Sequence, residues 1–180
     1  MPENQSTSEV TGAFITKARS LLMTDYLPKI ERCVEKLSDE KVWWRSGEES
    51  NSIGNLILHL CGNARQWIVS GLGGATDTRA RQSEFDERSL ISRAELIAHL
   101  RQTLSDVDAV LASLPPDAIL ERRTFQGTQE TVLDAIFHVV EHFSMHTGQI
   151  IQLTKMLTQS EMRFYDFSTG VPRADWQGRE

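Results

Sequence analysis

Three histidines recur at four-residue intervals late in the chain, at His138, His142 and His146. Residues four apart lie on one face of an α-helix, so imidazoles at this spacing can bind the same metal ion. With 5 histidines in 180 residues, about 0.1 such pairs are expected by chance. The three lie beside the apolar face of the expected helix, where a buried imidazole needs partners for its nitrogens. The pattern predicts a metal site; the alternative is histidines at the edge of the core that bond to backbone or water.

Another histidine, His59, lies in a second apolar segment and is the candidate for a further ligand. Its neighbours on the same helical face include Asn55, Asn63 and Gln66 and carry no charge. An uncharged polar stripe suits the wall of an internal cavity, with a partly exposed groove as the alternative. Zinc sites usually take three or four protein ligands, which His59 would help to supply. The amides of Asn55, Asn63 and Gln149 are expected to orient the ligands or a bound substrate.

Other residues capable of chemistry are expected to be structural. Glu141 could act as a base, but on a helix it projects about 100° away from His142, toward the charged face. His99 has no His, Cys or carboxylate four residues later and is interpreted as structural. Cys33 and Cys61 are interpreted as small buried hydrophobic residues. No catalytic residue is therefore assigned from the sequence.

The elements that must position these residues are four long helices. Apolar residues recur at three- and four-residue spacing, prolines are rare, and Ser92 with Glu95 forms a capping-box pattern. The segment RRTFQGTQETV could form a small hairpin with Gly127 in its turn. We predict an all-α four-helix bundle with helices over residues 13–37, 52–72, 92–114 and 131–157, Pro28 being expected to kink the first.

Composition bounds the class of protein. The chain is 39% hydrophobic and 24% charged, with a formal net charge of -6 and a pI near 5.4. This composition predicts one domain over residues 11–180, preceded by a flexible N-terminus over 1–10. The acidic charge without a Lys/Arg-rich run argues against nucleic-acid binding. The absence of a signal-like or membrane-spanning stretch, together with only two cysteines, predicts a cytoplasmic protein without a membrane partner.

The segments NSIGNLILHLCGNARQW and FHVVEHFSMHTGQI resemble the DinB-like superfamily of bacterial proteins, in one of its uncharacterised branches. The resemblance extends to the GLGG turn, RARQSEF and KMLTQSEMRFYDF, and so covers nearly the whole chain. It implies a bundle that holds one divalent metal ion through His59, His142 and His146. His138 matches a position that is often histidine in the family, without being implied as a ligand.

Characterised relatives in this superfamily include thiol-dependent S-transferases and isomerases, others are described as metal-dependent hydrolases, and many are homodimers. We therefore expect a metal-dependent enzyme acting on a small molecule or thiol, either a hydrolase or a small-thiol S-transferase. Zinc is the expected ion, with nickel or another transition metal as the alternative. The alternatives are a non-enzymatic bundle stabilised by metal and a metal-free bundle with pH-sensitive histidines.

The contacts of two further segments can also be predicted. RARQSEF (79–85) is expected to form surface ion pairs, within a charged connection over residues 75–90. The aromatic tail FYDFSTGVPRADW (164–176) is expected to pack on the core, because Phe and Trp carry large apolar areas. The alternatives are a cover over the mouth of a pocket and a subunit contact.

Overall fold

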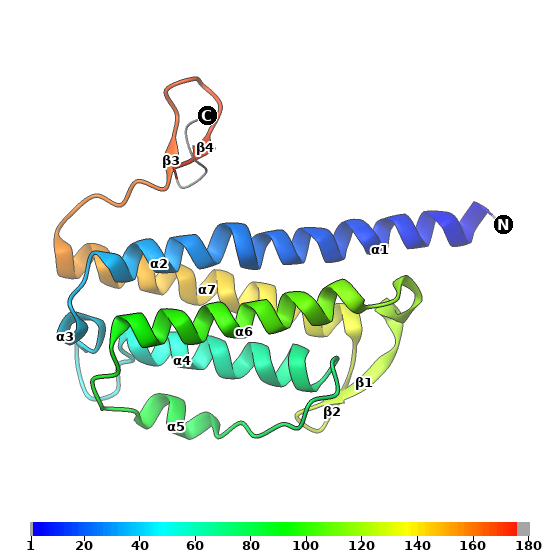
Figure 1. Cartoon of the computed structure of the whole chain (residues 1–180), viewed down its shortest axis with the longest axis horizontal. Helices are drawn as coiled ribbons and strands as arrows, with labels where there is room; N and C mark the ends of the chain where they lie inside the picture. The colour runs from blue at the N-terminus through cyan, green and yellow to red at the C-terminus, as the bar shows by residue number, and fades with distance from the viewer. Residues whose placement is uncertain (1, 176–180) are drawn as a thin grey trace.

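The computed structural model describes residues 2–175, in which four helical rods pack side by side (Figure 1). The rods are α1 (Pro2–Ser20), η1 (Leu21–Tyr26) and α2 (Leu27–Glu35) in line; α4 (Ile53–Ala64) and η2 (Arg65–Ser70) in line; α6 (Arg93–Ser113); and α7 (Val132–Thr158). Short helices α3 (Asp39–Val42), α5 (Arg81–Asp86) and the 3₁₀ turn η3 (Pro116–Leu120) lie in the connections. The predicted four-helix bundle is confirmed.

Capping boxes begin three of these rods. In each, the side chain of the cap residue accepts a hydrogen bond from a backbone N–H, and the side chain three residues later bonds back to the cap backbone. The capping box predicted at Ser92 is confirmed, and Ser52 caps the second rod. The pairs are Ser52 with Asn55, Ser92 with Glu95 and Thr131 with Asp134.

The first rod differs from its prediction at two places. Its helix begins earlier than the predicted start at residue 13, because α1 begins at Pro2, where a proline is tolerated in the first turn. Pro28 lies in a helix that continues to Glu35, and the π-helical η1 immediately precedes it. There the Leu27 N–H bonds to the Leu22 carbonyl five residues back, so the helix makes a π turn just before Pro28 that the sequence did not predict.

The predicted hairpin is present as β1 (Arg122–Phe125) and β2 (Thr128–Thr131), which pair antiparallel with Phe125 opposite Thr128. Gln126 and Gly127 form the two-residue turn, both with positive φ (50° and 85°). Such turns match the twist of paired strands. The hairpin leads directly into α7 and lies at one end of the bundle (Figure 1).

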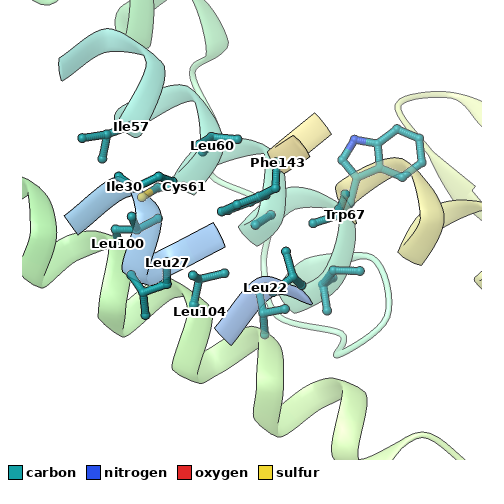
Figure 2. Close-up of a cluster of buried hydrophobic side chains, with 14 of the residues drawn as sticks. Leu22, Leu27, Ile30, Ile57, Leu60, Cys61, Trp67, Leu100, Leu104 and Phe143 are labelled. Carbon is teal, nitrogen blue, oxygen red and sulfur yellow. The ribbon is translucent and has the colours of Figure 1, made fainter. Parts of the chain in front are cut away.

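All four rods contribute to one apolar core, part of which Figure 2 shows. Its fully buried members include Leu22, Ile57, Leu60, Leu104 and Phe143. Because close-packed apolar side chains fix the distance between helices, this core holds α4 and α7 at a set spacing. Among the described residues, no helix is long and apolar enough to cross a membrane.

The core packing expected of the tail is found for Phe164, which is partly buried against the core, but not for Tyr165 and Phe167. Strands β3 (Tyr165–Asp166) and β4 (Arg173–Ala174) form a small hairpin beyond the end of α7 (Figure 1). Tyr165 is 39% exposed and Phe167 is 65% exposed, because the four rods already fill the core. The Tyr165 hydroxyl donates to Asp25, an attachment to the outside of the first rod. Trp176 lies outside the described residues.

Candidate metal centre

Three of the histidines meet between α4 and α7. His59 comes from α4, while His142 and His146 come from successive turns of α7. The Nε2 atoms of His59 and His142 are 2.9 Å apart, and the ring centroid of His146 lies 4.4 Å from that of His142 and 5.3 Å from that of His59. One potential ligand atom from each of the three lies within 4.8 Å of the others. The structure therefore brings together the three histidines on which the resemblance centres.

Hydrogen bonds indicate which nitrogens face the centre. His59 Nδ1 lies 2.8 Å from Glu84 Oε2, and His146 Nδ1 lies 2.7 Å from Gln149 Oε1. An ionised carboxylate and an amide oxygen only accept hydrogen bonds, so both Nδ1 atoms must carry the hydrogen. The Nε2 atoms of these rings are then left with lone pairs.

The Nε2 lone pair of His59 faces His142 Nε2 at 2.9 Å, whereas the buried Nε2 of His146 has no hydrogen-bond partner among the described residues. A cation could provide that partner. Burial, followed by the neighbouring His146, His59 and His138, lowers the pKa of His142 to about 3. The imidazole is thus neutral near neutral pH, and protonation cannot easily satisfy the cluster. The donor set fits a divalent transition-metal ion, for which neutral imidazole is a preferred ligand.

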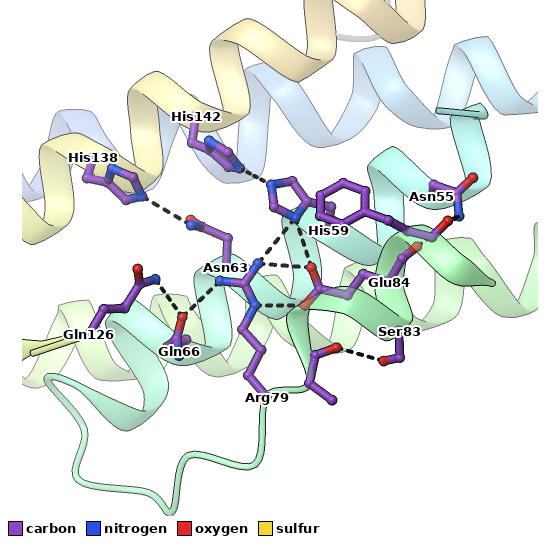
Figure 3. Close-up of polar contacts among 12 residues, drawn as sticks. Asn55, His59, Asn63, Gln66, Arg79, Ser83, Glu84, Gln126, His138 and His142 are labelled. Atoms are coloured by element: carbon purple, nitrogen blue, oxygen red, sulfur yellow. Dashed lines mark hydrogen bonds and ion pairs between the residues drawn. The ribbon is translucent and has the colours of Figure 1, made fainter. Parts of the chain in front are cut away.

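The connection between the second and third rods supplies a buried ion pair at this centre (Figure 3). Arg79 donates from Nε to Glu84 Oε1 at 2.7 Å and from Nη2 to Glu84 Oε2 at 2.9 Å. The two side chains are only 5% and 10% exposed, so the surface ion pairs predicted for RARQSEF are wrong for this pair. Burial opposes ionisation of Glu84, but hydrogen bonds from Arg79 and His59 lower the pKa of its carboxyl. Arg79 and Glu84 are buried because the connection that carries them folds back onto α4 (Figure 3).

The sequence analysis missed Arg79 and Glu84 as site residues. Neither has the four-residue spacing that identifies a ligand pair on a helix, and charged residues in a connection usually face water. One signal was available in Gly62, which follows His59 by nearly one helical turn. A Cβ at position 62 would overlap the Glu84 carboxylate, so the glycine leaves room for it.

The amides expected near the site have different partners. Gln149 contacts His146 directly, as described above. Asn63 lies 3.1 Å from Nε2 of His138 through its Nδ2 atom, and its Oδ1 is buried without a partner among the described residues. Asn55 contacts none of the three histidines in the described contacts: its oxygen accepts from Ser52 and Arg45, and its Nδ2 donates to the Glu84 carbonyl. Asn55 therefore acts on the site through the connection.

The remaining candidates are not members of the group of three histidines. The ring of His138 stacks on Trp67 at 4.1 Å between centroids and lies 5.6 Å from the ring of His142. Glu141 is exposed on α7. His99 lines a pocket of about 330 Å³ with Gln66 and Asp77, and Arg79 and Glu84 also line this pocket. His138 thus lies beside the three grouped imidazoles without belonging to the group, whereas His99 is not in contact with them in the described contacts.

Access to the cluster is uneven. His59 is 5% exposed and His146 is 8% exposed, while His142 is partly exposed. The Phe85 ring covers His59 at a centroid distance of 4.6 Å. His142 is therefore the most exposed of the three imidazoles.

Comparison with known proteins supports the fold. A family model described as a protein of unknown function (DUF1572) matches residues 9–171. The solved DinB-like protein YjoA of Bacillus subtilis is 16% identical with a TM-score of 0.63, over 82% of this chain and 96% of that one. A DinB-like protein of Bacillus cereus is 16% identical with a TM-score of 0.60, over 74% of this chain and 87% of that one. Curated proteins give no match. The DinB-like fold predicted from the sequence is confirmed.

Proposed function

We propose that this chain, which belongs to the family of proteins of unknown function DUF1572, is a metal-dependent enzyme, either a hydrolase or a small-thiol S-transferase. Its ion would be zinc or a similar divalent metal held by His59, His142 and His146. The observation that carries the proposal is the convergence of three imidazoles with no fourth ligand in the group, among the residues described. Three protein ligands are typical of catalytic sites, whereas structural zinc sites usually have four.

The chain's own residues would prepare this site in three ways. Glu84 and Gln149 hold the Nδ1 hydrogens of two ligands, which leaves Nε2 free to bind. Phe85 covers one side of the cluster and limits water there. The partly exposed edge of His142 leaves an approach for substrate. A bound divalent ion would supply Lewis acidity, which makes water or a small thiol easier to deprotonate near neutral pH.

The first test is metal content. We expect untagged protein, stripped of metal and then dialysed against zinc, to bind about one ion per chain. Replacement of His59, His142 or His146 by alanine should abolish stoichiometric binding, because two imidazoles hold zinc weakly. His99→Ala is the matched control and should bind like the unchanged protein. Equal binding by His142→Ala would contradict the site, and the absence of binding in the unchanged protein would leave a metal-free bundle.

The second test distinguishes an open site from a closed one. Cobalt(II)-loaded protein should change its visible spectrum when a small thiol or a competing anion is added, since an open position exchanges ligands. A thiolate-to-cobalt charge-transfer band favours the S-transferase, and a response to anions and pH alone favours the hydrolase. An unchanged spectrum with every added ligand would instead indicate a metal that only stabilises the bundle.

A further inference from the structure

We propose that Glu84, held by Arg79, is a positioning residue for His59. It fixes the imidazole with its hydrogen on Nδ1 and directs the Nε2 lone pair toward His142 and His146. This inference adds to the metal-dependent function proposed above. Only the expected effect of Glu84 on metal binding rests on that proposed function. The state of the His59 ring is a property of the metal-free protein and can be measured separately.

The contacts of the carboxylate define the arrangement. Oε1 accepts from Arg79 Nε, while Oε2 accepts both from Arg79 Nη2 at 2.9 Å and from His59 Nδ1 at 2.8 Å. Arg79 Nη2 itself approaches His59 Nδ1 to 3.2 Å, and since a guanidinium only donates, Oε2 is the shared acceptor of both groups. Arg79 Nη1 donates in turn to Gln66 Oε1 at 2.9 Å on η2. Arg79 thus holds both carboxylate oxygens of Glu84, one of which also accepts from the His59 ring.

The second rod is built to receive this carboxylate. Gly62 provides the space, because a side-chain carbon there would overlap Oε1. Asn55 donates to the Glu84 carbonyl oxygen at 2.8 Å and so fixes the backbone of α5. The Phe85 ring then packs on His59. Three positions on α4, at 55, 59 and 62, therefore bind one short segment that is distant in sequence.

The expected consequence follows from how imidazole chooses its tautomer. The ring nitrogen that carries the hydrogen is set by the hydrogen bond made at that nitrogen. With a carboxylate at Nδ1, Nε2 keeps its lone pair, which accepts from His142 Nε2 in the metal-free protein and is the atom that could bind a metal ion. An amide at position 84 offers only one acceptor oxygen. It therefore cannot accept from Nε and Nη2 of Arg79 and from His59 Nδ1 as the carboxylate does. Its NH₂ group would compete to donate to Nδ1, which favours a hydrogen on Nε2 and blocks metal binding.

The experiment compares Glu84→Gln with Asp86→Asn, which makes the same charge change on α5 at an exposed residue that bonds to Gln82. Two quantities are measured: the His59 tautomer by ¹⁵N NMR of metal-free protein, and zinc affinity by competition with a chelator. Arg79→Lys is a second variant, which keeps the charge and loses the two-pronged contact. Circular dichroism establishes that each variant folds.

We expect Glu84→Gln to raise the population of the Nε2–H tautomer and to weaken zinc binding by about 10–100-fold. Arg79→Lys should have a smaller effect of the same sign, and Asp86→Asn should have none. An unchanged tautomer in folded Glu84→Gln would overturn the role of Glu84, and an unchanged tautomer and affinity in Arg79→Lys would overturn that of Arg79. If the tautomer shifts but the unchanged protein binds no zinc, the positioning role is supported and the metal-dependent function fails.

Discussion

At the scale of single residues, the same residue type has different roles here because its surroundings differ. His59, His142 and His146 direct nitrogens at one another, whereas His138 stacks on Trp67. Gln149 assists a ligand, while Asn55 holds the backbone of the connection. Partner and burial, rather than identity, decide what each side chain can do.

The cysteines provide a prediction at this scale. Cys33 and Cys61 are fully buried, and desolvation raises the pKa of the first to about 11 and of the second to about 12. We expect neither thiol to react with a disulfide reagent in the folded protein near neutral pH, because the thiolate is the reactive form. Both should react after denaturation. A thiol that reacts rapidly in the native protein, or only after metal removal, would contradict their assignment to the core.

At the scale of elements, replacing glycine by alanine should have opposite effects on stability in a hairpin turn and in a helix. Gly127 has φ of 85° in the β1–β2 turn, and Gly148 lies on an exposed part of α7. A Cβ meets nothing within 4 Å at either place, so packing does not enter the comparison. Backbone conformation alone should therefore set the effect of a methyl group.

These two glycines form a matched pair of variants. Gly127→Ala should destabilise the protein by about 1 kcal/mol, because an L-residue is strained at positive φ. Gly148→Ala should stabilise it by about 0.5–1 kcal/mol, because alanine loses less conformational entropy in a helix. Denaturant unfolding measures both. Changes of the same sign would show that one of these backbone conformations is wrong.

At the scale of the whole molecule, the core and the candidate metal centre are separable. The core includes Leu22, Ile57, Leu104 and Phe143, which are fully buried without any contribution from the histidines. Because apolar burial dominates folding free energy, the bundle should fold without metal. The ion should add stability through binding alone.

Removal of metal tests this separation. We expect chelation to leave helicity nearly unchanged in circular dichroism and to lower the melting temperature. Zinc at one hundred times its dissociation constant should restore about 2.7 kcal/mol by mass action. His142→Ala should melt at the same temperature with or without zinc. Loss of most helicity on chelation would mean that the metal organises the fold, as in structural zinc domains.

Much of the fold could be predicted from the sequence because its signals are local. Helical periodicity, the capping box at Ser92 and the turn at Gly127 each depend on residues a few positions apart. The convergence of His142 with His146 follows from the same local geometry. The extension of α1 to Pro2 and the π turn before Pro28 were missed, because element ends and local helix variants leave weak sequence signals.

The sequence by itself determined the four helices and a histidine pair on one of them, since hydrogen bonding within a helix fixes which residues share a face. Only the tertiary structure decided that His59 reaches that pair, that Glu84 and Arg79 are buried beside it, and that Tyr165 and Phe167 remain outside the core. These contacts join positions far apart in the chain. They depend on how side chains pack across helices, which no spacing along the sequence encodes.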